Sequence, residues 1–181
     1  MELTNGYLLR TKDGGSGITF SDFVLLGGSN STEIQGTWFP DLCSYYNMIP
    51  SFNGCGGATF AKLNVTNNIT DDKGGIANDP VNIGKPNNSI TQLEYYLDTY
   101  TDTPDIIMIC FGVNDAFWIR QNNAYTIGNL DTVMSKTLPE IYNGSFNDDF
   151  SIYTLLGSMR YVLETLKTTH PNTPIIGVLP W

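Results

Sequence analysis

Hydrophobic residues in this chain gather in short continuous runs that are separated by longer amphipathic stretches. A continuous apolar run at 23–26 and largely apolar runs at 105–111 and 174–180 predict strands buried on both faces, as the strands of a parallel sheet are. A weaker run at 49–53 predicts one more strand, which lies second in chain order. Glycine follows the first three runs in chain order, which fixes where the predicted strands end.

The stretches between these runs repeat apolar residues every three or four positions. This spacing predicts helices over 38–48, 90–100 and 151–167, and a shorter helix over 130–138. Strands that alternate with helices form a parallel sheet with right-handed crossovers. The predicted fold class is therefore α/β, a three-layer α/β/α sandwich with a parallel, flavodoxin-like sheet.

The domain organisation follows from the same pattern. Residues 1–21 contain a Gly-rich turn between two short apolar segments and predict a lead-in or hairpin, and residues 22–181 form the α/β domain. The segment 64–89 is rich in Asn, Asp, Gly and Pro without any periodicity, which predicts a solvated loop beside the end of the second strand. Its Asp71-Asp72 pair lacks the alternating ligand spacing of a calcium loop.

The amino-acid composition argues against several classes of binding partner. The 181 residues carry 18 Asp and Glu against 9 Lys and Arg, a net charge of −9, which argues against binding to nucleic acid or anionic lipid. Three cysteines without a Cys-x-x-Cys pair and a single histidine argue against a structural metal, and we expect no cofactor. No apolar run reaches the length of a membrane span, and residues 1–15 lack the pattern of a signal peptide.

Candidate chemistry lies where the predicted strands end. In an open parallel sheet, ligands bind outside the carboxyl ends of the strands. Those ends are the segments 27–32, 54–59 and 112–115, which are rich in glycine and in hydroxyl and amide side chains. Glycine allows a ligand to approach backbone N–H groups closely, so this edge favours the binding of a polar or anionic group.

These three segments resemble the conserved blocks of the SGNH hydrolases, also called GDSL-type esterases. The order is Gly-Gly-Ser at 27–29, Gly-x-x-Gly-Ala-Thr at 54–59, and Gly-Val-Asn-Asp at 112–115 after a hydrophobic strand. The third block is the most specific, and the segment 170–181 is similar to the family's next helix-to-strand junction. The resemblance covers residues 22–181.

The resemblance implies a serine esterase that acts on an acyl ester of a carbohydrate or a small molecule, and an acetyl ester is the acyl ester that we expect. Ser29 would be the nucleophile, and its N–H, the N–H of Gly54 and the side-chain amide of Asn114 would form the oxyanion hole. The residue types suit this chemistry, because a serine at a strand end projects into the cleft and neutral donors stabilise a developing oxyanion. No cofactor is needed.

The chain departs from the family pattern at three places. Gly28 stands where an Asp usually precedes the nucleophile, and Phe52 stands where an Asn is common before the second block. The Asp-x-x-His block that supplies the acid–base pair does not occur up to Trp181. We therefore expect the N-terminal portion of a longer hydrolase, without its last strand and helix and inactive as it stands.

His170 does not replace the missing base in this interpretation. It precedes the fourth predicted strand, whereas Ser29 follows the first, so the two lie at opposite ends of a parallel sheet, roughly 16 Å apart along five strand residues. We expect His170 to be a solvated residue at a helix C-terminus.

Two other functions fit the same pattern. Ser29 and Asn114-Asp115 could cap helices, which leaves a non-catalytic carbohydrate-binding or structural module with aromatic side chains near the cleft (Trp38, Phe117, Trp118 and Trp181). A flavodoxin-like binder of phosphate or flavin shares the architecture, but its phosphate loop should be richer in hydroxyls and lack Gly-x-Asn-Asp.

Overall fold

The computed structural model describes eight segments of the chain: residues 22–27, 38–46, 49–52, 58–62, 70–71, 74–76, 88–116 and 127–178. The expected lead-in at 1–21 lies outside these segments. Within them, no helix is long and apolar enough to cross a membrane.

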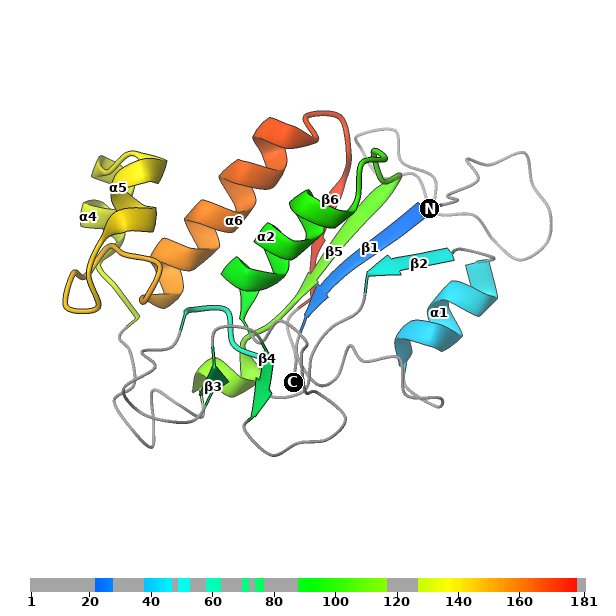
Figure 1. The fold of residues 1–181 in the computed structure, drawn as a ribbon, viewed down its shortest axis with the longest axis horizontal. Coiled ribbons are helices and arrows are strands. Elements are labelled where there is room, and N and C mark those ends of the chain that lie inside the picture. The colour runs from blue at the N-terminus through cyan, green and yellow to red at the C-terminus, as the bar shows by residue number, and fades with distance from the viewer. Residues whose placement is uncertain are drawn as a thin grey trace.

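A parallel sheet of four strands forms the centre of the described structure (Figure 1). Its strands are β1 (Asp22–Gly27), β2 (Ile49–Phe52), β5 (Ile106–Cys110) and β6 (Ile175–Gly177). They lie in the order β2-β1-β5-β6, and every neighbouring pair is parallel. The α/β class, the parallel sheet and all four predicted strands are confirmed.

The strand order contains one reversal of direction across the sheet. The chain passes from β1 to β2 on one side and then returns to place β5 and β6 on the other side of β1. In sheets of this kind the ligand site lies at such a switch point, outside the carboxyl ends of the two central strands. Gly27 and Cys110 are register partners at the ends of β1 and β5. We call this place the carboxyl edge.

The two faces of the sheet are buried by different helices. Alternate residues of β1 and β5 point to opposite faces, as strand geometry requires. One face, which carries Val24 and Ile107, packs against α2 (Ser89–Thr99) and α6 (Leu155–Thr169). The opposite face packs against α1 (Trp38–Tyr46), through a cluster of Leu25, Ile106, Met108, Cys110, Leu42 and Cys43. Burial on both faces explains why the strands are continuously apolar.

The predicted helix boundaries shift where side chains cap the helices. Asn88 caps α2 with a capping box that includes Thr91, and both Asn88 and Ser89 are buried. The predicted loop 64–89 therefore extends two residues too far. Helix α6 begins at Leu155 rather than at 151, because the Thr154 side chain accepts the N–H of Gly157 and ends the preceding turn.

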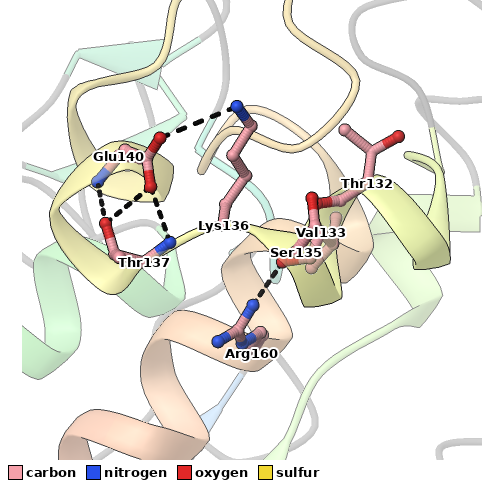
Figure 2. Close-up of polar contacts among 7 residues, drawn as sticks. All are labelled: Thr132, Val133, Ser135, Lys136, Thr137, Glu140 and Arg160. Atoms are coloured by element: carbon pink, nitrogen blue, oxygen red, sulfur yellow. Dashed lines mark hydrogen bonds and ion pairs between the residues drawn. The ribbon is translucent and has the colours of Figure 1, made fainter.

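The single helix predicted over 130–138 is wrong. Two helices, α4 (Leu130–Ser135) and α5 (Leu138–Asn143), replace it. Figure 2 shows the cause at their junction: Thr137 and Glu140 form a capping box that starts a new helix. Pro139 lacks the N–H that a continuous helix would need, so the break is built into the sequence.

A short antiparallel pair interrupts the segment that was predicted to be a loop. Strands β3 (Thr70–Asp71) and β4 (Gly74–Ile76) pair with each other and not with the central sheet. The expectation of a segment without regular structure is wrong for these residues. The Asp-Asp-Lys-Gly sequence at 71–74 is a turn signal between them, and reading it would have predicted a hairpin.

Candidate functional site

Of the three predicted site residues, the structure describes one. Ser29 and Gly54 lie outside the described residues, as do Phe117, Trp118, Trp181 and the side chain of Trp38. Asn114 is described, and it lies just beyond the end of β5 at the carboxyl edge.

Asn114 sits on a sharp turn that follows β5. Gly112 has a φ of +122°, a backbone conformation that favours glycine, and the helical turn 113–116 begins directly after it. The Asn114 side chain donates a hydrogen bond from Nδ2 to the carbonyl of Ala58 at 2.8 Å. A helix cap would instead accept a backbone N–H through the side-chain oxygen. The hydrogen bond to Ala58 therefore joins two segments that are distant in sequence. It is not the contact that a helix-capping Asn would make.

Asp115, the next residue, is 1% exposed and holds the same distant segment. Its carboxylate accepts the N–H of Phe60 at 2.9 and 2.7 Å and the N–H of Ala61 at 3.1 Å. Hydrogen bonds to a charged acceptor are stronger than those between neutral groups. Asn114 and Asp115 thus fix the segment 58–61 against the end of β5.

The N-terminus of α2 holds this segment from another side. The N–H of Ser89 donates to the carbonyl of Thr59 at 2.9 Å, and the Ser89 hydroxyl donates to the carbonyl of Phe60. Lys62, which directly follows the segment, donates its N–H to the carbonyl of Ile152 at 2.9 Å. Because its backbone groups are bound on several sides, the segment keeps a defined position at the carboxyl edge.

Gln92, one turn further along α2, binds the end of β1. Its Oε1 accepts the N–H of Gly27 at 2.9 Å, and its Nε2 donates to the carbonyl of Gly27 at 2.9 Å. Sequence analysis missed this residue. Its signal was a polar side chain at a position that helical spacing places beside the apolar residues Leu93 and Tyr96.

His170 lies far from these groups, at the other end of the sheet. It caps the C-terminus of α6 and precedes β6, near Thr173, whose hydroxyl donates to the carbonyl of Pro104 before β5. Its Nε2 lies 3.0 Å from the Tyr96 hydroxyl, while its Nδ1 is buried without a hydrogen-bond partner. The expectation of a helix C-terminus is confirmed, but the side chain is half-buried and bound rather than solvated.

Burial controls the protonation of this pair. It lowers the pKa of His170, which favours the neutral ring, and it raises the pKa of Tyr96 to about 12. Tyr96 therefore keeps its proton near neutral pH, and its hydroxyl can donate a hydrogen bond to Nε2 of the neutral imidazole. His170 lies at the end of the sheet opposite to the carboxyl edge, so it takes no part in chemistry there.

The described residues offer neutral donors rather than metal ligands or reactive thiols. Among them, no group of three or more His, Cys, Asp or Glu side chains could hold a metal ion. Cys43 and Cys110 are free and buried, and burial raises the pKa of Cys43 to about 11. Since the thiolate is the nucleophilic form, Cys43 is unreactive near neutral pH.

No protein-family model and no curated protein matches the sequence. Among solved structures, the chain is similar to the crystal structure of a protein from Lactobacillus plantarum, with 18% identity and a TM-score of 0.48. The similarity covers 90% of this chain and 57% of the Lactobacillus plantarum protein, so this chain spans little more than half of that protein's length. At these values, the similarity assigns neither a family nor a function.

Proposed function

We propose that the protein is a serine ester hydrolase of the SGNH type, built on a three-layer α/β/α sandwich. Its substrate in this proposal is an acyl ester, specifically an acetyl ester, of a carbohydrate or a small molecule. The observation that carries the proposal is the side-chain amide of Asn114, which is held on the Ala58 carbonyl at the switch point of the sheet.

A fixed amide is what an oxyanion hole requires. The Asn114 amide carries two N–H groups, and the hydrogen bond to Ala58 uses one of them. The second can donate to an oxyanion that forms beside the turn. Because the amide is already oriented, it needs no rearrangement when charge develops on the substrate, and this is the condition under which a donor accelerates acyl transfer most.

In the sequence, the other two proposed groups stand close to residues of this edge. Ser29 follows Gly27 by two residues. Gly27 is the register partner of Cys110, and Asn114 follows Cys110 by four residues. Gly54 precedes Ala58, which Asn114 binds, by four residues.

The acid–base pair that this mechanism requires has no candidate among residues 1–181. These residues include one histidine, His170, which lies at the opposite end of the sheet, and no Asp-x-x-His sequence occurs among them. The proposal therefore assigns the nucleophile and the oxyanion hole. Its test uses the protein expressed from its entire reading frame.

The test combines covalent labelling with ester turnover. A fluorophosphonate probe should label the purified protein, and Ser29→Ala should abolish both the labelling and the hydrolysis of p-nitrophenyl acetate. Ser16 also follows two glycines and provides the matched control, because Ser16→Ala should change neither. Glycan binding without labelling or turnover would favour the non-catalytic carbohydrate-binding module instead.

A further inference from the structure

The proposed nucleophile follows a strand end that is held by a buried side chain from another element. Gln92 on α2 is 0% exposed and binds both backbone polar groups of Gly27, 65 positions away in the sequence. A buried polar side chain is costly unless its hydrogen bonds are made, so this contact fixes the relative position of α2 and the end of β1.

The carboxamide acts here as a neighbouring strand would. It presents one acceptor and one donor on a single planar group, which matches the N–H and the carbonyl of one residue. Among the described residues, β2 pairs with β1 no further than Val24, so the end of β1 extends beyond its β2 partner. Gln92 satisfies the backbone of Gly27 at the point where the chain leaves the sheet.

The same helix holds the segment that Asn114 binds. Ser89 lies three residues before Gln92 on α2 and binds the carbonyls of Thr59 and Phe60. Residues three apart on a helix share one side of it. The first turns of α2 therefore connect the end of β1, from which the chain continues to Ser29, with the segment 58–61 that is fixed by Asn114.

We propose that Gln92 is a positioning residue of the esterase: by holding Gly27, it sets the direction in which the chain continues to Ser29 and so aligns the nucleophile with Asn114. This role rests on the proposed function. Misplacement of a reacting group by about 1 Å can cost about 10²-fold in rate, so the contact matters for turnover as well as for stability.

The experiment measures kcat and KM for p-nitrophenyl acetate in Gln92→Met, which keeps the side-chain length and removes both hydrogen bonds. We expect kcat to fall by about 10–10²-fold while KM stays within about twofold, because the loss affects alignment and not binding. Thr173→Val is the matched control. It removes a buried hydrogen bond at the opposite end of the sheet and should leave kcat unchanged.

A second variant, Gln92→Glu, separates positioning from packing. An ionised carboxylate can only accept hydrogen bonds, whereas a protonated carboxyl group can also donate to the carbonyl of Gly27. The kcat of Gln92→Glu, divided by the wild-type kcat at the same pH, should therefore rise as the pH falls from 8 to 5. A residue that only fills space would give a flat ratio.

The outcomes distinguish the two proposals. Ser29-dependent turnover with the same kcat in wild type and Gln92→Met would overturn the positioning role and leave the esterase intact. Absence of Ser29-dependent turnover in the wild type would overturn both. If Gln92→Met does not fold, the decision rests on the kcat of Gln92→Glu divided by the wild-type kcat. A ratio that does not change with pH overturns the positioning role.

Discussion

The polar contacts of the carboxyl edge differ in kind from those of the helical region 127–154. At the carboxyl edge, side chains bind backbone groups 29 to 65 positions away, as Ser89 and Gln92 do. In the helical region the side-chain contacts are mostly local: Asn129 caps α4 three residues ahead, and Thr137 and Glu140 cap α5 over the same distance (Figure 2).

The difference in sequence separation indicates the structural role of each set of contacts. Local caps satisfy the free N–H groups of one helix, and an isolated segment could form them. The contacts at the carboxyl edge exist only when β1, β5, α2 and the segment 58–61 are assembled. They are buried as well, which makes each of them costly to lose. Such contacts fix the relative positions of distant groups, and a site built from several strand ends requires this.

The largest loss of stability is expected from Asp115→Ala. It would leave the buried N–H groups of Phe60 and Ala61 without an acceptor, at about 1–3 kcal/mol each, or about 2–6 kcal/mol in total. Asp148→Ala is the control from the helical region, because Asp148 accepts from Ser145 in an exposed turn and should cost about 0.5–1.5 kcal/mol. Urea denaturation measures both, and equal losses would contradict the distinction between the two regions.

Gly157→Ala tests whether the packing of α6 against the end of the helical region is tight. A Cβ at this position would lie 2.1 Å from the carbonyl oxygen of Ser151 and 2.4 Å from that of Phe150, both backbone atoms. Overpacking of this kind costs about 1–3 kcal/mol. At Gly177 a Cβ meets nothing within 4 Å, so Gly177→Ala should not destabilise the fold. Thermal melts of the two variants should differ, and similar melting temperatures would refute the packing argument.

A smaller effect is expected from Thr137→Ala. The variant removes the capping box of α5, which lies on the exposed surface, and should cost about 1 kcal/mol. It should leave ester turnover unchanged, because the hydrogen bonds of the box join Thr137 to Glu140, whose carboxylate otherwise pairs with Lys136 at the end of α4. A drop in kcat would show that the helical region is coupled to the carboxyl edge.

The smallest effect concerns pH. Burial lowers the pKa of His170 in the folded protein, so at a pH well above about 6.5 the ring is neutral in both states and contributes no pH dependence. As the pH falls below that value the unfolded chain binds the proton first, and stability decreases until the folded ring also titrates. The difference in unfolding free energy between wild type and His170→Gln, followed from pH 8 to 5, should show this decrease. A constant difference would contradict it.

The sequence predicted the parts of the fold that depend on local pattern. Strands buried on both faces are continuously apolar, so β1 and β5 could be recognised from their runs alone. The break between α4 and α5 also has a local sequence signal, in Thr137 and Pro139. It was overlooked because the apolar spacing continues across the break.

Partners distant in sequence could not be predicted in the same way. The motif singled out Asn114 and Asp115, but nothing in it indicates that their partners are Ala58 and Phe60, because those contacts depend on how the strands are ordered. Gln92 was missed for the same reason, since its partner is 65 positions away. Local patterns specify elements, whereas the carboxyl edge is specified by their assembly.

The most direct test of the esterase proposal is Asn114→Ala in the protein expressed from its entire reading frame, with kcat, KM and thermal melting measured together. If Asn114 donates to the oxyanion, kcat should fall by about 10²–10³-fold with little change in KM. Asn129→Ala is the matched control, because it removes the Asn that caps α4 and should lower the melting temperature while sparing turnover. A lowered melting temperature with unchanged kcat in Asn114→Ala would contradict the proposal and leave Asn114 as a structural link to Ala58 alone.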